Sequence, residues 1–379
     1  MKICIDASNL RRGGGRTHLI EFLTHIEKTN SDLHIDVWGS NETLSLLPNR
    51  NFISKKNHKY LDKSLPYRIY FQKFCLDKIA KENEIDVLFV PGGSYSGNFK
   101  PVVTMCRNML LFEWDELKRY FPSIFFFKLL ALRIVQKRSF NNADGLIFLT
   151  KYAQDIVSKH IRKKISIAKI PHGLNDRFQM APRPQRDINI CSRENPFKIL
   201  YVSTIDKYKH QENLIKAISS LRNELDWNLS LILVGSAYTP SLKTLKKEIE
   251  AQNSNVSWVD YKGSIPFDSL HNEYEKADLG VFASSCENLP NTLIEMMGAG
   301  LPIASSNFGP MKEVLKDGGE YFNPTSNESI KNAVKRLIED PSKRDISASK
   351  AFLYAKDYNW VETSEKTIEF LESFSKQDR

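Results

Sequence analysis

Short apolar runs alternate with amphipathic stretches along most of the chain. The apolar runs, which predict buried strands, span residues 2–6, 33–38, 86–90, 101–105, 145–150, 198–203, 229–235, 256–258, 279–283 and 302–305. The amphipathic stretches, which predict helices, span residues 16–26, 151–159, 211–223, 241–252, 267–276 and 310–316. Strands that alternate with helices are typical of a parallel, doubly wound sheet, so we expect an α/β protein.

This alternation is interrupted once. Residues 181–196 are rich in proline and arginine and show no periodicity, which predicts a linker. The linker would join a Rossmann-like domain at 1–180 to a second one at 197–358, with the ligand site in a cleft between the two sheets. The final amphipathic stretch has no strand after it, and we expect the segment 359–379 to cross back as a helix onto the first domain.

The composition is that of a globular protein, with 41% hydrophobic and 26% charged residues in a chain of 379. The net charge of +9 is unevenly spread, because residues 1–180 carry +12 and the remainder carry −3. A basic first domain suits nucleic acid, an anionic membrane or a phosphorylated substrate as the partner.

Five scattered cysteines form no Cys-x-x-Cys pair, which argues against a disulfide framework or a zinc site and indicates a reducing compartment. Asp6 interrupts the first apolar run too early for a signal peptide. No apolar run reaches the roughly 18–20 residues that a membrane span needs. We therefore expect a cytoplasmic protein.

Two acidic residues flank a predicted helix start. Glu287 follows the strand 279–283, Pro290 suits the first turn of a helix, and Glu295 lies one to two turns further on. A helix N-terminus binds anions such as phosphate, so an acid on either side suits a ligand with a central diphosphate. Glu295 would then bind the vicinal hydroxyls of a ribose, and Glu287 would lie at the reacting end.

These acids have two other interpretations. As a glycosidase pair they would be the acid and the nucleophile, but their spacing disfavours that chemistry. As plain surface acids of a helix they would need a polar surrounding, whereas the flanking sequence is apolar and rich in glycine.

Lys209 follows the strand 198–203 and precedes the helix 211–223, which places it at the carboxyl edge of the predicted sheet. There it would face the same cleft as the Glu287 loop, well placed to neutralise a diphosphate. Taken alone, Lys209 is a solvated loop lysine; the acids of the neighbouring loop favour the binding role.

The loop Gly13-Gly14-Gly15 follows the first predicted strand and lets the backbone approach a phosphate closely. A plain turn and an NAD(P) fingerprint are the alternatives. The fingerprint is incomplete, because His18 occupies the third glycine position and Asp36 lies inside a strand instead of at its end.

The chain has no Asp-x-Asp motif, so no metal clamp on a diphosphate is expected, and no cofactor. His18, His172 and His210 are isolated in the sequence, and we expect structural roles for them rather than that of a general base. Arg107 and Asn108 follow the strand 101–105 as candidate acceptor contacts; a polar loop with a salt bridge is the alternative.

Residues 121–138 are aromatic, apolar and basic, as interfacial helices often are. Their cations do not share one clean face, so a helix buried in the first domain is the alternative. The positive charge of the first domain favours a membrane contact.

Several motifs together resemble the retaining glycosyltransferases of family 4, which have the GT-B fold of two facing Rossmann-like domains. The matching motifs are Glu287-x7-Glu295, Gly298-Ala299-Gly300-Leu301-Pro302, Gly309-Pro310-Met311-Lys312-Glu313-Val314, Ile170-Pro171-His172-Gly173-Leu174 and the stretch 256–263. They cover the second domain with high specificity and the first more thinly. This resemblance implies a UDP- or GDP-linked sugar donor, metal-independent transfer and retention at the anomeric carbon.

The resemblance also implies roles for individual residues. Glu295 would hold the ribose. The donor sugar would be contacted by Glu287, Asn288 and Leu289, and the base by Tyr261, Lys262 and Gly263. The diphosphate would be bound by Lys209 and by Thr204, Lys207, Gly14, Gly15, Asn291, Thr292 and Leu293. The acceptor would be contacted by Arg107, Asn108 and His18.

Two departures from the family pattern stand out. Thr204 replaces an arginine ahead of the phosphate lysine, with Lys207 as the compensating cation, and Cys106-Arg107-Asn108 replaces a histidine near the acceptor. The variants around Lys209 and Arg107 resemble a bacterial subgroup that builds O-antigen or other surface polysaccharide on lipid-diphosphate carriers. Its members imply a lipid-linked saccharide acceptor and peripheral contact with an anionic membrane on the cytosolic face.

Three other functions are kept as alternatives. The first is a nucleotide-sugar epimerase or hydrolase of similar architecture, and the second is a catalytically silent partner that binds nucleotide sugars. The third, a nucleic-acid-binding protein, has no recognition motif in its favour.

Overall fold

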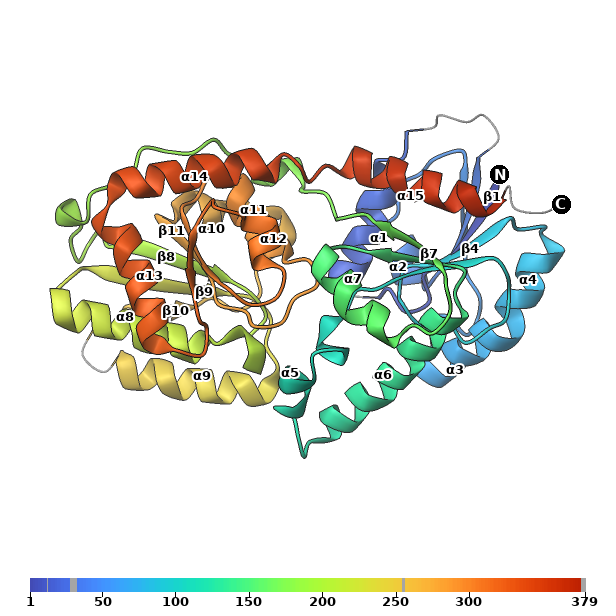
Figure 1. Ribbon diagram of the computed structural model, residues 1–379, viewed down its shortest axis with the longest axis horizontal. Coiled ribbons are helices and arrows are strands. Elements are labelled where there is room, and N and C mark those ends of the chain that lie inside the picture. Colours follow the sequence, from blue (N-terminus) through green and yellow to red (C-terminus); the bar gives the residue numbers. More distant parts are fainter. Residues whose placement is uncertain (12, 28–32, 254–255, 376–379) are drawn as a thin grey trace. The chain divides into compact units, whose positions relative to one another are not determined.

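A computed structural model describes residues 1–11, 13–27, 33–253 and 256–375 (Figure 1). The chain folds as two compact units. Unit 1 comprises Met1–Gly173 with Asn359–Arg379, and unit 2 comprises Leu174–Tyr358.

Unit 1 is built on a parallel sheet with the strand order β3-β2-β1-β4-β5-β6-β7. Its strands are β1 (Lys2–Asp6), β2 (His34–Trp38), β3 (Ile53–Lys56), β4 (Val87–Val90), β5 (Val102–Met105), β6 (Gly145–Phe148) and β7 (Ser166–Lys169). The register places Ile5 opposite Val37 on one side and Phe89 on the other. Because every strand in the sheet runs the same way, the loops after the strands gather at one edge, where ligands of such folds bind.

The helices of unit 1 cover both faces of this sheet. They are α1 (Gly14–Thr24), α2 (Asn41–Leu44), α3 (Leu65–Tyr70), η1 (Phe71–Leu76), α4 (Asp77–Glu82), η2 (Met109–Leu111), α5 (Trp114–Lys118), α6 (Ile124–Asn142), α7 (Lys151–Val157), η3 (Ser158–His160) and α15 (Trp360–Ser375). Helix α15 packs on α1 and β4. On the other face, Phe71 and Leu76 of η1 form one core cluster with Cys4 and Leu88. Figure 1 shows this division, with α1 and α15 above the sheet and α3, α4 and α6 below it.

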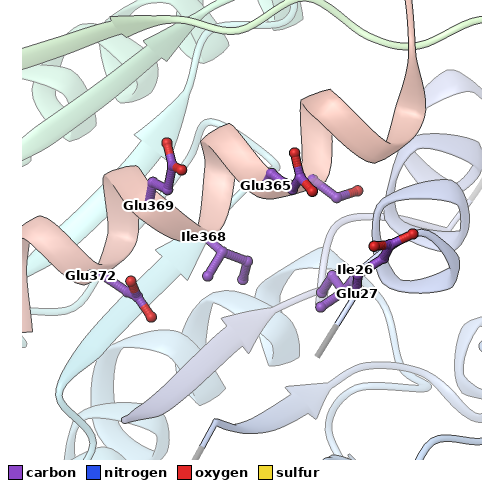
Figure 2. A pocket seen from close by; sticks show the side chains of 7 residues that line it. Ile26, Glu27, Glu365, Ile368, Glu369 and Glu372 are labelled. Atoms are coloured by element: carbon purple, nitrogen blue, oxygen red, sulfur yellow. The ribbon is translucent and has the colours of Figure 1, made fainter. Parts of the chain in front are cut away.

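Beside α15 lies a pocket of about 250 Å³ lined by Ile26, Glu27, Ser364, Glu365, Ile368, Glu369 and Glu372. Figure 2 shows three glutamates of α15 and Glu27 around two isoleucine side chains. Ser364 donates a hydrogen bond to the carbonyl of Phe22 at 3.0 Å, which ties α15 to α1. Helix α15, predicted within the segment 359–379, is thus a part of unit 1, and its outer side is acidic.

Unit 2 is also built on a parallel sheet, with the order β10-β9-β8-β11-β12-β13. Its strands are β8 (Phe197–Val202), β9 (Leu229–Val234), β10 (Val259–Tyr261), β11 (Leu279–Phe282), β12 (Ile303–Ser306) and β13 (Glu320–Phe322). Its helices are η4 (Asp176–Phe178), η5 (Ile188–Ile190), η6 (Lys207–Lys209), α8 (Gln211–Leu225), α9 (Thr239–Gln252), η7 (Phe267–Ser269), α10 (His271–Lys276), α11 (Asn291–Gly298), α12 (Met311–Leu315), α13 (Asn327–Glu339) and α14 (Pro341–Ala355). The predicted α/β class with two Rossmann-like sheets is confirmed.

The stretch predicted as a linker, 181–196, lies inside unit 2. Arg183 donates hydrogen bonds to the carbonyls of Tyr274 and Ala277, and Arg186 pairs with Asp278 at 3.1 Å. The arginines that marked this stretch as irregular therefore fasten it to the unit. The chain passes between the units at 173/174 and at 358/359.

One predicted strand lies in a different place. Residues 256–258 are not a strand; the edge strand is β10, which starts at Val259. The side chain of Asn253 accepts hydrogen bonds from the backbone N–H groups of Trp258 and Val259, at 3.0 and 3.2 Å. The apolar Val256 is about half exposed, so the pattern there marks the approach to the strand and not the strand itself.

Candidate active site

Two loops of unit 2 meet at the carboxyl edge of its sheet, because they follow the neighbouring strands β8 and β11. Ser285 joins them: its backbone N–H donates to the carbonyl of Tyr208 at 2.8 Å, and its hydroxyl lies 2.9 Å from Nε2 of His210. His210 has a φ of 50°, a left-handed turn that ends η6 and starts α8. Hydrogen bonds of Ser285 therefore hold the two loops together.

This junction brings Lys209 and Glu287 into an ion pair. Lys209 is 8% exposed, and its ammonium group also lies 5.1 Å from the ring of Tyr208 and 5.5 Å from that of Phe282. The aromatic faces and the carboxylate together hold a cation at the sheet edge. An anionic ligand that replaced Glu287 as the partner of Lys209 would free the Glu287 carboxylate next to the bound ligand.

Glu295 lies in α11 and is 8% exposed. The hydroxyl of Tyr274, from α10, donates a hydrogen bond to its Oε2 at 2.7 Å. Burial raises the pKa of Glu295 to about 7, although the bond from Tyr274 opposes this shift. A carboxylate that titrates near neutrality and has one oxygen fixed by a tyrosine is prepared to accept hydrogen bonds from ligand hydroxyls with the other.

Helix α11 begins at Asn291, with Pro290 at the preceding cap position. Among the described residues, no side chain caps this end. Asn291 is exposed, Thr292 is half-buried and Leu293 is fully buried, so Leu293 has only its backbone to offer a phosphate. Asn288 and Leu289, predicted next to the donor sugar, are both buried in the loop before the helix.

The residues predicted around the base lie at the end of β10. The hydroxyl of Tyr261 donates to the carbonyl of Gly235 at 2.8 Å, and the ammonium of Lys262 binds Glu273 at 2.6 Å. Gly263 has a φ of +71° and accepts a hydrogen bond from the N–H of Gly235. At this corner, hydrogen bonds hold the phenol ring of Tyr261 and the carbonyls of Gly235 and Gly263 in place.

Thr204 and Lys207 lie on the loop that carries Lys209. Thr204 is exposed, and its carbonyl accepts a hydrogen bond from the side chain of Gln211 at 3.0 Å. Lys207 is exposed as well, and its backbone N–H is bound by the side chain of Asp206 at 2.7 Å. Both residues thus lie beside the buried lysine on the solvent side of the loop.

In unit 1, Arg107 extends to the glycine loop. Its guanidinium donates to the carbonyl of Gly14 at 2.7 Å and approaches that of Gly15 at 3.5 Å. Gly13 has a φ of +65°, so the turn into α1 needs a glycine at this position. Burial lowers the pKa of Arg107 to about 10. In this structure Arg107 holds the loop, while Asn108 caps η2 by accepting the N–H of Leu110 at 3.1 Å.

Two of the histidines that are isolated in the sequence are neighbours in the fold. The rings of His18 and His172 have their centroids 4.5 Å apart, and each ring lies 5.7 Å from that of Trp360. His18 is 2% exposed, and neither of its ring nitrogens has a hydrogen-bond partner among the described residues. The pair could not be found in the sequence, because the tertiary fold brings together the first helix, the end of unit 1 and the start of α15.

The sequence interpretation also missed Tyr274 and Ser285. Neither belongs to a recognisable motif: one lies on a short helix and the other in a serine pair after β11. Both act through spatial neighbours, Glu295 and His210, so only the folded chain reveals them.

The fold and this site define a two-domain α/β protein of the GT-B class. Solved structures share the fold: an Anabaena HepE complex with UDP is 17% identical, covers 98% of this chain and 99% of its own, and has a TM-score of 0.69. Sucrose-phosphate synthase from Thermosynechococcus elongatus is 16% identical over 98% of both chains, with a TM-score of 0.72.

Residues 185–352, most of unit 2, match the family model described as glycosyl transferases group 1. The O-antigen chain mannosyltransferase B of Escherichia coli is 26% identical, over 45% of this chain and 44% of its own. A Salmonella typhimurium lipopolysaccharide 1,2-N-acetylglucosaminetransferase is 25% identical, over 55% and 57%. The chain spans about half the length of these relatives. The resemblance to a glycosyltransferase family is confirmed.

Proposed function

We propose that this protein is a metal-independent, retaining glycosyltransferase that moves a sugar from a UDP- or GDP-sugar to a lipid-linked saccharide in bacterial surface polysaccharide synthesis. The observation that carries this proposal is the buried Lys209–Glu287 pair at the sheet edge of unit 2. Support for the substrates comes from relatives named for O-antigen and lipopolysaccharide synthesis and from a structural neighbour solved with UDP.

The donor would lie along the β8, β11 and α11 edge. Glu295 would accept the ribose hydroxyls, and its neighbour Tyr274 would keep it oriented. The diphosphate would replace Glu287 as the partner of Lys209. It would lie at the start of α11, where backbone N–H groups and the helix dipole favour negative charge. Glu287, released from its lysine, would then contact the transferred sugar.

In the transfer step, the bond from the anomeric carbon to the diphosphate oxygen breaks and its electrons stay with the diphosphate. The acceptor oxygen forms the new bond on the same face, which is retention. The leaving oxygen is then the base nearest the acceptor hydroxyl and takes its proton. Lys209 and the α11 N-terminus would stabilise the charge that develops on the leaving group, so no metal ion is needed.

Unit 1 would bind the acceptor. Arg107 and Asn108 lie after β5, and the glycine loop that Arg107 holds would offer its backbone to a phosphate. His18 would act from beneath this loop as a positioning residue, because its ring is buried. A lipid-linked acceptor requires work at a membrane surface, where residues 121–138 would make contact through the exposed Phe121, Ile124 and Phe127. The described helices include none with the length and apolarity needed to cross a bilayer.

Donor binding and transfer test this function in two steps. UDP, GDP and a panel of nucleotide sugars should raise the melting temperature if they bind the folded protein. The best donor, supplied radiolabelled with lipid-linked oligosaccharide, should give a labelled lipid product in the presence of EDTA. Nucleotide release without a labelled acceptor would indicate a hydrolase instead, and the absence of any nucleotide-induced shift would contradict the donor site.

A further inference from the structure

Helix α3 of unit 1 has no buried residue, although it is mostly apolar. Leu65, Tyr67 and Tyr70 are each about half exposed, and Phe74 in the following η1 is 56% exposed. Helices on a soluble surface normally turn such side chains inward. The opposite side of the same helical stretch does so, because Phe71 and Leu76 are buried. We call the exposed aromatic side, formed by Tyr67, Tyr70 and Phe74, the α3 face.

Lysines accompany the α3 face. Lys63 lies 4.9 Å from the centroid of the Tyr67 ring, and Lys73 lies 5.1 Å from that of Phe74. No acidic residue occurs between Lys63 and Leu76. The two carboxylates that flank the stretch are engaged elsewhere: Asp62 accepts from Asn41 and Asn57, and Asp77 from Tyr95 and Asn98.

Helices α5 and α6 show the same combination. Trp114, Phe121, Ile124 and Phe127 are all more than half exposed, and the guanidinium of Arg133 lies 5.7 Å from the Trp114 ring. Residues 117–143 contain six lysines and arginines and no acid. Because Phe126 and Leu129 of α6 are buried, the helix is anchored, and its outward side is apolar and basic.

The two stretches lie on the same face of the sheet. Right-handed crossovers from β3 to β4 and from β5 to β6 place α3–α4 and α6 on one side, as Figure 1 shows. Both also bind the short loop after β4. Gln72 of η1 donates to the carbonyl of Ser94 at 3.1 Å, and the N–H of Tyr95 donates to the hydroxyl of Ser139 in α6 at 3.1 Å.

We propose that the α3 face is a second contact with an anionic lipid bilayer, next to α6, so that unit 1 lies on the membrane through two elements. Exposed aromatic and aliphatic side chains surrounded by lysines, without acids, complement the boundary between acyl chains and anionic headgroups. A groove for nucleic acid would need its cations along a track, whereas here they lie at the margin of an apolar surface. The inference rests on the peripheral location included in the proposed function.

Vesicle co-sedimentation of the full chain tests this contact without any substrate. Wild type should bind vesicles of phosphatidylglycerol and phosphatidylethanolamine, bind phosphatidylcholine vesicles much less, and release in high salt. The double variant Tyr70→Ser/Phe74→Ser should bind the anionic vesicles at least about tenfold more weakly, since two of the inserted groups are lost. The matched control Ile346→Ser/Leu353→Ser removes equally exposed apolar side chains from α14 in unit 2 and should bind like wild type.

The outcomes separate the two proposals. If Ile124→Ser/Phe127→Ser abolishes vesicle binding while Tyr70→Ser/Phe74→Ser leaves it intact, α6 is the sole contact and the inference is wrong. If the wild-type protein does not bind anionic vesicles, the proposed peripheral location is contradicted together with this inference. In both cases a retained melting shift with nucleotide leaves the transferase proposal standing, and for the α3 variant that shift also shows that the protein is folded.

Discussion

The hydroxyl of Tyr274 donates a hydrogen bond to Oε2 of Glu295 at 2.7 Å inside unit 2. Both groups are buried, and the carboxyl has a pKa of about 7 because burial disfavours its charge. The bond opposes that effect, since a donor stabilises the ionised carboxylate. Tyr274 therefore increases the fraction of Glu295 that is charged, and able to accept hydrogen bonds from a ribose, at neutral pH.

Replacing Tyr274 with phenylalanine should weaken nucleotide binding. The change removes the donor while keeping the ring, which packs edge-on against Phe178 at 5.6 Å. A hydrogen bond to a charged group is worth about 1.5–3 kcal/mol, so we expect a roughly ten- to hundredfold higher Kd for UDP or GDP at pH 7. Isothermal titration calorimetry measures this Kd. An unchanged Kd in a folded Tyr274→Phe variant would remove Tyr274 from the donor site.

Glu295 should give a measurable dependence of stability on pH. Its folded pKa of about 7 lies above the ordinary value of 4.5, so the folded state binds the proton more tightly. Protonation of Glu295 therefore adds on the order of 3 kcal/mol to the free energy of unfolding. This contribution is fully present below pH 4.5 and is lost as the pH rises through about 7. Urea unfolding of wild type and Glu295→Gln across this range should show the loss in wild type alone.

The same titration predicts the opposite trend for ligand binding. If Glu295 binds the ribose as a carboxylate, nucleotide affinity should rise as the pH increases through about 7. In Glu295→Gln the affinity should be low and flat. Equal pH profiles for the two proteins would contradict the ribose assignment.

Lys209→Ala should abolish most transfer. If the ammonium stabilises the leaving diphosphate as one preorganised donor, its loss costs about 3–4 kcal/mol, or roughly a hundred- to thousandfold in kcat. Lys246→Ala, an exposed lysine of α9, is the matched control and should turn over like wild type. Because Glu287 loses its partner in Lys209→Ala, the double variant Lys209→Ala/Glu287→Ala separates the two effects. It should recover stability without recovering activity.

The sequence predicted the central strands well and the edge strands poorly. The predicted strand 2–6 coincides with β1, and 229–235 differs from β9 by one residue, because fully buried strands are continuous apolar runs. The edge strands β3, β7 and β13 were not predicted. Each is short and partly exposed, so its apolar pattern is weak.

The same reasoning applies to the site. The sequence predicts that Lys209 faces the same cleft as the Glu287 loop, because both follow strands of one parallel sheet. The structure goes further and joins the two side chains in an ion pair. Tyr274 was not predicted, since its role depends on how a short helix packs against α11. The contact between His18 and His172 is not predictable, because nothing in the sequence relates two residues that far apart.

The His18–His172 pair should make unit 1 sensitive to acid. Burial and the nearby Arg107 lower the pKa of both imidazoles well below 6.5, so the folded state holds them neutral. Their contribution to stability is present above pH 6.5 and is lost as the pH falls towards the folded values, which is opposite in sign to that of Glu295. His18→Leu removes one of these groups and also two ring nitrogens that are buried without hydrogen bonds.

The variant should therefore lose less stability than wild type between pH 6.5 and 5. At pH 7 it should be no less stable, because an unsatisfied buried polar group costs about 1–3 kcal/mol. Urea unfolding at several pH values, followed by tryptophan fluorescence to which Trp360 beside the pair contributes, measures both effects. If the acid slopes of wild type and His18→Leu coincide, the buried imidazoles do not control the acid stability of unit 1.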